Sequence, residues 1–155
     1  MQIPFNAPVF DLRGVYTGRL VSIHDGDTFT CVIPLLDTFY KFSIRLAGID
    51  TCEMTSKDPK IKNNALMARD RLFSLFTSSN TNNTISWTKK DFERYLSENY
   101  ITVSMNCKGS DKYGRVLAEV SNFSDVLVRE KLAYRYDGGT KLSETEILER
   151  VVSDT

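Results

Sequence analysis

Three short segments combine acidic and basic residues at spacings suited to binding a metal ion and an anion. The first is His24-Asp25-Gly26-Asp27-Thr28. Asp27 opens a predicted strand, which would hold its carboxylate rigidly, and hard divalent cations prefer such oxygen ligands. Asp-Gly before an alternating strand is equally typical of a tight turn, so both interpretations stay open.

The second segment runs from Arg45 to Glu53 and carries three charged residues that matter here. Asp50 and Glu53 follow directly after a predicted strand, and Arg45 lies on its polar face. A guanidinium group can grip a phosphate through two parallel hydrogen bonds, and a neighbouring carboxylate can orient or deprotonate a water molecule. The alternative is that Asp50 and Glu53 are solvated loop charges.

The third segment is Asp111-Lys112-Tyr113-Gly114-Arg115. It also fits a hairpin turn. Arg115 would begin the last predicted strand at one mouth of a barrel. A second arginine there would stabilise negative charge that develops on a phosphorus centre during phosphoryl transfer.

Alternating and helical hydrophobic patterns indicate the elements that must position these segments. Strands are predicted over residues 15–23, 28–33 and 40–46. In the third strand Tyr40, Phe42, Ile44 and Leu46 face one way, and Lys41, Ser43 and Arg45 face the other. A helix is predicted over residues 62–76, with a stripe of Ala65, Ala68, Leu72 and Phe76.

Further elements follow a polar loop at residues 78–84. A short helix is predicted over residues 90–97, and strands over 101–105 and 116–120 enclose a turn at 108–114. A helix over residues 124–134 would begin with Ser124 as N-cap. A last helix begins at Ser143, where Glu146 completes the spacing of a capping box.

This order predicts an α+β fold, a five-stranded OB barrel with about three α-helices packed against it. Residues 1–13 are predicted to be an N-terminal arm, and residues 14–155 one domain with an insert at about 78–99.

Composition limits the classes of function. The 155 residues contain 20 Lys and Arg and 20 Asp and Glu, so the formal net charge is zero. That balance argues against a purely electrostatic nucleic-acid binder, but it permits an enzyme with one local basic cluster.

Compartment and metal type follow from the cysteines and the N-terminus. The three cysteines form no C-x-x-C pair, which argues against zinc. Their odd number and wide spacing suit a reducing, intracellular compartment. Neither a signal peptide nor a membrane span is expected, although a protein with its signal removed would look the same.

Together the three segments resemble the staphylococcal nuclease, or thermonuclease, family from about Gly18 to Tyr136. The resemblance is carried by Asp25-Gly26-Asp27-Thr28, by Arg45-Leu46 with Asp50-Thr51 and Glu53, and by 111–115. The stretch 127–133 is similar to the family's second helix.

This resemblance implies an OB barrel and calcium-dependent cleavage of DNA and RNA with little sequence specificity, giving 3′-phosphorylated products. It implies one Ca²⁺ ion bound by the Asp27 and Asp50 carboxylates and the Thr51 carbonyl. It implies Glu53 as the general base and Arg45 and Arg115 as phosphate-binding residues. The substrate-binding residues it implies are Lys112, Tyr113, Tyr134 and Tyr136. The expected partner is therefore DNA or RNA, with no membrane and no obligate protein partner.

Two features depart from the family. Cys52 stands where the family usually has proline, which would leave the turn before Glu53 freer. It is either a tolerated small residue or a thiol through which oxidation affects the site. The insert holds Trp87 and several basic residues, and it is interpreted either as an aromatic-anchored surface loop or as an added nucleic-acid contact.

The alternative function is a non-catalytic OB-fold module that binds nucleic acid or protein. Asp27, Arg45, Asp50, Glu53 and Arg115 are all present, which favours the enzyme.

Overall fold

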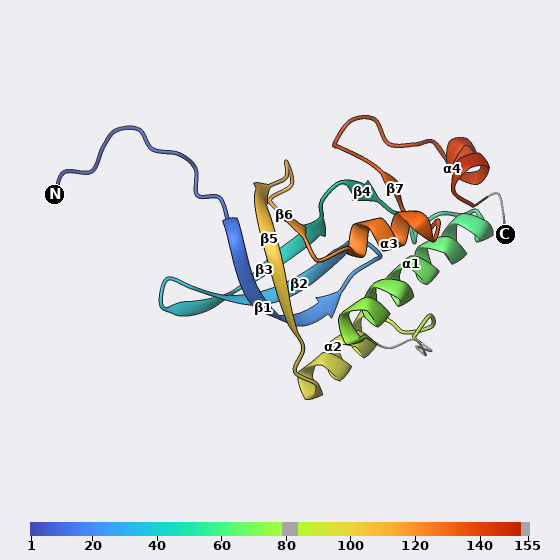
Figure 1. Ribbon diagram of the computed structural model, residues 1–155, viewed down its shortest axis with the longest axis horizontal. Coiled ribbons are helices and arrows are strands. Elements are labelled where there is room, and N and C mark those ends of the chain that lie inside the picture. The colour runs from blue at the N-terminus through green and yellow to red at the C-terminus, as the bar shows by residue number, and fades with distance from the viewer. Residues whose placement is uncertain (79–83, 153–155) are drawn as a thin grey trace.

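A closed five-stranded barrel forms the centre of the protein, as the computed structural model of residues 1–78 and 84–152 shows (Figure 1). The barrel strands are β1 (Arg13–Ile23), β2 (Thr28–Leu35), β3 (Thr38–Leu46), β5 (Thr102–Ser110) and β6 (Val116–Glu119). Their order around the barrel is β1-β2-β3-β6-β5. All neighbours are antiparallel except β3 and β6, whose parallel pairing closes the barrel. The predicted α+β, OB-like barrel is confirmed.

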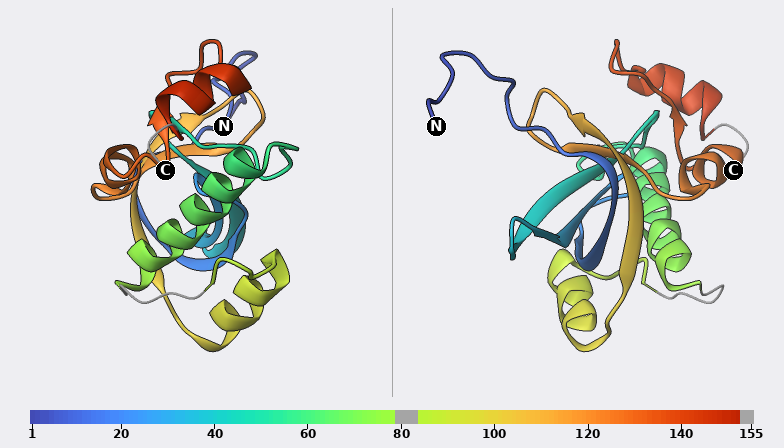
Figure 2. Two further views of the ribbon diagram at one scale, coloured as in Figure 1. Left: turned by 90° about the vertical axis from the view of Figure 1, so that its right-hand side faces the viewer. Right: turned by 60° about the vertical axis from the view of Figure 1, so that its left-hand side comes forward.

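Four α-helices accompany the barrel in the described residues, where about three were predicted. They are α1 (Pro59–Thr77), α2 (Lys89–Glu98), α3 (Phe123–Arg129) and α4 (Glu144–Arg150). Figure 2 shows α1 crossing one end of the barrel and α2 below it. No helix among the residues described is long and apolar enough to cross a membrane.

Capping signals explain where the helices begin. Asp58 accepts hydrogen bonds from the backbone of Lys60 and Ile61, with Pro59 in the first turn of α1. Thr88 and Asp91 form a capping box on α2. The capping box predicted for α4 between Ser143 and Glu146 is confirmed.

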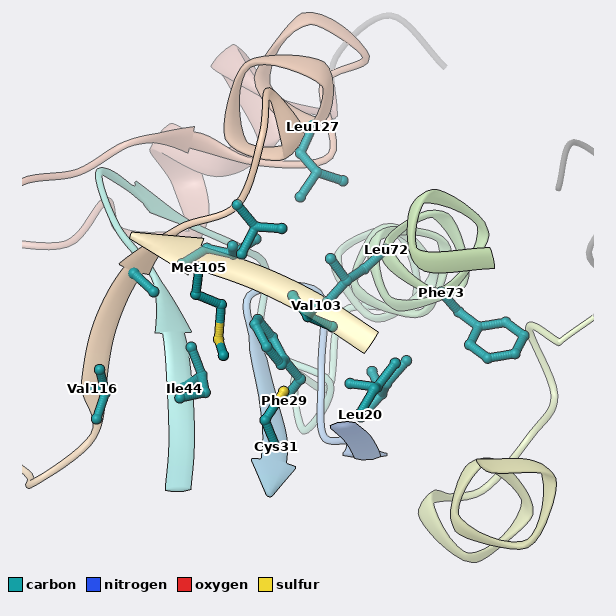
Figure 3. Packing of buried hydrophobic residues seen from close by; sticks show 14 of the residues in the cluster. Leu20, Phe29, Cys31, Ile44, Leu72, Phe73, Val103, Met105, Val116 and Leu127 are labelled. Atoms are coloured by element: carbon teal, nitrogen blue, oxygen red, sulfur yellow. The ribbon is translucent and has the colours of Figure 1, made fainter. Parts of the chain in front are cut away.

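The core fills the barrel interior with alternating strand residues. Figure 3 shows Leu20, Phe29, Ile44 and Met105 directed toward one another, with Leu72 of α1 closing the end. All five side chains are fully buried. Because they come from five different elements, burying them fixes the positions of the strand ends that carry the charged residues.

The predicted apolar row on β3 is only half right. Ile44 and Leu46 are buried, but Tyr40 is 46% exposed. The reason is that β6 pairs only with Ile44, Arg45 and Leu46. The preceding residues of β3 pair with β2 alone and form a hairpin that extends beyond the barrel.

The helix predicted over 124–134 is too long, and its N-cap is wrong. Asn122 is the N-cap, and the Ser124 hydroxyl instead donates to the Ala47 carbonyl over 3.2 Å. The helix ends at Arg129, where Lys131 adopts a φ of 61° and the Leu132 amide donates back to the Leu127 carbonyl.

That reversal allows a small second sheet to form. Strand β7 (Tyr134–Arg135) pairs antiparallel with β4 (Ile49–Asp50), which follows β3 after Ala47 and Gly48. Tyr134 therefore lies in a strand directly opposite Asp50 and not in a helix.

The ends of the chain and the insert are described only in part. Residues 1–12 contain no helix or strand and extend away from the barrel (Figure 1), although Leu12 is buried. Most of the loop predicted at 78–84 lies outside the described residues. In the insert, Trp87 packs against Phe73, Phe92 and Tyr95 with ring centroids 5.2–5.8 Å apart. This packing favours the interpretation of the insert as a surface loop anchored by one aromatic residue.

Candidate active site

The turn that carries Asp27 is fixed by close packing against α1. A Cβ atom added to Gly26 would lie 2.6 Å from the Cβ of Ala68 and 3.1 Å from the Cγ2 of Thr51. Glycine is therefore required by the approach of the helix. The Asp25 carboxylate accepts the backbone N–H of Asp27 over 3.1 Å, which completes the turn. The turn predicted from Asp-Gly is thus present, and Asp27 lies in it directly before β2, which begins at Thr28.

Arg45 lies between two buried carboxylates. Its guanidinium donates over 2.8 Å to Oδ2 of Asp27 and over 3.1 Å to Oδ1 of Asp50. The three side chains are each only 6–7% exposed. β3 supplies the arginine, β2 pairs Thr28 beside it, and β4 supplies Asp50.

Negative charge is in excess around this arginine. Burial raises the pKa of Asp27 from 3.8 to about 6, the Asp25 carboxylate adds to the shift, and Arg45 offsets only part of it. Burial lowers the pKa of Arg45, but the two carboxylates outweigh that effect and raise it. The guanidinium therefore stays charged, and an added cation would relieve the repulsion among the acids.

The Asp50 carboxylate is held from the opposite strand as well. The phenol of Tyr134 donates to Oδ2 of Asp50 over 2.6 Å. Burial, with the hydrogen bond to Asp50, raises the pKa of Tyr134 well above its usual value, so it remains a donor. Tyr134 was predicted to bind substrate; the structure places it beside the carboxylate and outside the cavity described below.

Cys52 and Glu53 follow Asp50 but face different surroundings. Cys52 is buried in a small apolar cluster with Ile61, Ala65 and Ile147, and burial raises the pKa of its thiol to about 11. Glu53 is exposed. Packing in this cluster therefore stabilises the turn before Glu53 without a proline at position 52. It leaves the Glu53 carboxylate in solvent.

Arg115 is oriented by a turn that Asp111 organises. The Asp111 carboxylate accepts the backbone N–H groups of Tyr113 and Arg115, each over 2.9 Å, and the Arg115 guanidinium over 2.8 Å. The Tyr113 side chain is exposed, with Lys112 and Arg115 over its ring at 5.2 and 5.4 Å.

A cavity of about 490 Å³ brings the arginines together. Its lining includes Arg45, Arg115, Lys112, Tyr113, Tyr136 and Lys141. Tyr136 faces Arg45, whose guanidinium carbon lies 5.9 Å from the ring centroid. Five of the predicted site residues therefore share one cavity. Asp27, Asp50 and Thr51 are buried and do not line it, but Asp27 and Asp50 bind the Arg45 guanidinium, which does.

The donors available to a metal ion are few but of the right type. No group of three or more His, Cys, Asp or Glu side chains suited to a metal ion occurs in the described residues. The expected set contains only two such side chains, Asp27 and Asp50, with the Thr51 carbonyl. Hard oxygen donors beside uncompensated negative charge fit Ca²⁺ and not a thiolate-preferring ion.

Two residues at the site were not singled out for a role by sequence reasoning. Asp111 was recognised only as part of its segment. An aspartate whose carboxylate accepts backbone N–H groups a few residues later is a local turn signal that could have identified it. Lys141 gave no signal at all. Its ammonium lies 3.5 Å from Oδ2 of Asp50 and 3.8 Å from Oε1 of Glu53.

No protein-family model matches the chain, and no curated protein matches its sequence.

Proposed function

We propose that the protein is a calcium-dependent nuclease of the thermonuclease type, which hydrolyses phosphodiesters of DNA and RNA. The observation that carries this proposal is the cavity of about 490 Å³ in which Arg45 and Arg115 converge, backed by the buried carboxylates of Asp27 and Asp50. Two fixed guanidinium groups beside carboxylates suit an anionic substrate whose charge increases in the transition state.

Each residue has a distinct task in this proposal. Arg45 and Arg115 bind the phosphate oxygens, and their own carboxylate partners hold the guanidinium groups in place before substrate arrives. Glu53, which solvent reaches, orients a water molecule and accepts its proton during in-line attack. Tyr113 and Tyr136 offer ring faces for stacking on a base or sugar, which requires little sequence preference.

Asp27, Asp50 and the Thr51 carbonyl would hold one Ca²⁺ ion, which when bound neutralises the phosphate and polarises its P–O bond. Tyr134 fixes the Asp50 carboxylate by its hydrogen bond, as outer residues often fix metal ligands. Cleavage to 3′-phosphorylated products is proposed from the family resemblance.

The test compares wild-type protein with Glu53→Gln on plasmid DNA and on RNA, with Ca²⁺ or with a chelator. We expect degradation by wild type only with Ca²⁺, and a loss of at least roughly a hundredfold in the variant. Glu93→Gln, an exposed substitution of the same type on α2, is the matched control and should retain wild-type rates.

Binding of nucleic acid without any Ca²⁺-dependent cleavage would instead support the non-catalytic module. Undiminished cleavage by a folded Glu53→Gln protein would exclude Glu53 as the base.

A further inference from the structure

We infer that Lys141 is a resident counter-ion of the Asp50 and Glu53 carboxylates, which gives way to the divalent cation and then contacts the substrate phosphate. The inference rests on the proposed function, because it assigns a role to a residue at that same site. Lys141 comes from the segment between β7 and α4, far along the chain from the acids it faces.

The ion pairs of Lys141 differ in geometry from those of Arg45. The Lys141 ammonium lies 3.5 Å from Asp50 and 3.8 Å from Glu53, distances longer than the 2.8 Å contact between Arg45 and Asp27. Charge-assisted hydrogen bonds are shorter than either Lys141 contact. Lys141 is therefore held mainly by electrostatic attraction, whereas Arg45 is held by directed hydrogen bonds.

The Lys141 side chain is free to move, whereas that of Arg45 is enclosed. The Lys141 side chain is 51% exposed, whereas that of Arg45 is 7% exposed. A lysine stem has four flexible carbons, so the ammonium can leave one partner without displacing the backbone. The backbone itself is tethered, since the Tyr136 phenol donates to the Gly139 carbonyl over 2.7 Å.

The acidic residues around Lys141 outnumber the basic residues that pair with them. Among the residues that the structure describes, the ion pairs of Asp27, Asp50 and Glu53 are with two cations, Arg45 and Lys141. A divalent cation bound at Asp50 would repel an ammonium this close, and the repulsion is strongest at low ionic strength. Loss of Lys141 should therefore strengthen binding of the cation.

The Lys141 ammonium can reach the cavity in which the proposed phosphate would bind. Lys141 lines the same cavity as Arg45 and Arg115, and it lies 5.9 Å from the Tyr136 ring. A phosphate that enters between the arginines comes within reach of a lysine released from Asp50. The same residue thus opposes the metal ion and favours the nucleotide, and a merely structural lysine would not show these opposite effects.

The experiment measures both affinities by titration calorimetry at low salt. The variants are Lys141→Met, which retains the length of the stem, and Lys141→Arg, which retains the charge. Lys90→Met, which removes an equal charge from the exposed start of α2, is the control. Circular dichroism melting shows that each variant is folded.

We expect Lys141→Met to bind Ca²⁺ alone roughly tenfold more tightly than wild type. At saturating Ca²⁺ it should bind a nucleoside 3′,5′-bisphosphate roughly fivefold more weakly. Lys141→Arg and Lys90→Met should both remain close to wild type. High salt should reduce the difference in Ca²⁺ affinity.

Equal or weaker Ca²⁺ binding by folded Lys141→Met, beside a wild type that binds Ca²⁺, would overturn this inference and leave the nuclease proposal standing. Unchanged bisphosphate affinity would overturn the second half of the role. Absence of Ca²⁺ binding to wild type would overturn the inference and the proposed metal site together.

Discussion

The Tyr134 phenol donates a hydrogen bond of 2.6 Å to Oδ2 of Asp50, although 84 residues separate them in the chain. The contact exists because β7 pairs with β4, with Tyr134 directly opposite Asp50. Tyr134 thus supports an acidic residue of the site, and Tyr136, two residues further on, lines the cavity.

Tyr134→Phe should lower the free energy of unfolding by about 1 kcal/mol, because a part-buried hydrogen bond to a carboxylate is lost while the ring remains. Urea denaturation measures this change. Tyr40→Phe is the control, since Tyr40 is exposed on the β2–β3 hairpin and should change stability little. Equal stability of Tyr134→Phe and wild type would show that the hydrogen bond contributes nothing net.

Arg45→Gln should be strongly destabilising in Ca²⁺-free buffer, by about 3–5 kcal/mol. The substitution leaves the buried Asp27 and Asp50 carboxylates without their shared cation, and unpaired buried charges are costly. Added Ca²⁺ should restore part of the lost stability. Thermal melts with and without Ca²⁺ test both statements, and a variant as stable as wild type would contradict them. Loss of activity on changing Arg45 therefore has to be corrected for folding.

Cys52 should resist alkylation in the folded protein. Burial, with the nearby Asp50 and Glu53 carboxylates, raises the pKa of the thiol to about 11, and the thiolate is the reactive form. Treatment with iodoacetamide at pH 8, followed by mass spectrometry, should modify Cys52 only after urea is added. Rapid modification of the native protein would show that the Cys52 thiol is reactive in the folded state, and would support the alternative that its oxidation affects the site.

The Asp111 carboxylate should stabilise the fold at neutral pH, and this stabilisation should be lost at acidic pH. Burial raises its pKa, but hydrogen bonds from the Arg115 and Tyr113 backbone and from the Arg115 guanidinium outweigh burial and lower it below 3.8. A carboxyl whose pKa is lower in the folded state stabilises the fold above its unfolded pKa, and this stability is lost as the pH falls through the folded pKa.

Asp111→Asn should therefore cost about 1 kcal/mol at pH 7, and the difference from wild type should shrink below pH 4. Urea titrations of both proteins between pH 7 and pH 2 measure that difference. A gap that stays constant down to pH 2 would show that the Asp111 charge contributes nothing.

Features that depend on neighbours in the chain were predictable from sequence. The alternation of β2 and β5, the helical stripe of α1 and the Ser143–Glu146 capping box involve residues at most four positions apart or a simple period. The Asp111 turn is equally local, since its carboxylate bonds to residues two and four positions later. The order of these elements and the family resemblance together predicted the closed barrel.

Features that depend on distant segments were decided by packing. Arg45 lies on the polar side of an alternating strand, yet it is buried, because the Asp27 turn and β4 close over it. The helix predicted to reach Tyr134 ends at Arg129, because β7 pairs with β4. Lys141 meets Asp50 only through the path of the chain between β7 and α4. Sequence periodicity reports which face of an element is apolar, but a buried ion pair depends on which elements meet, and that is set by the burial of the whole core.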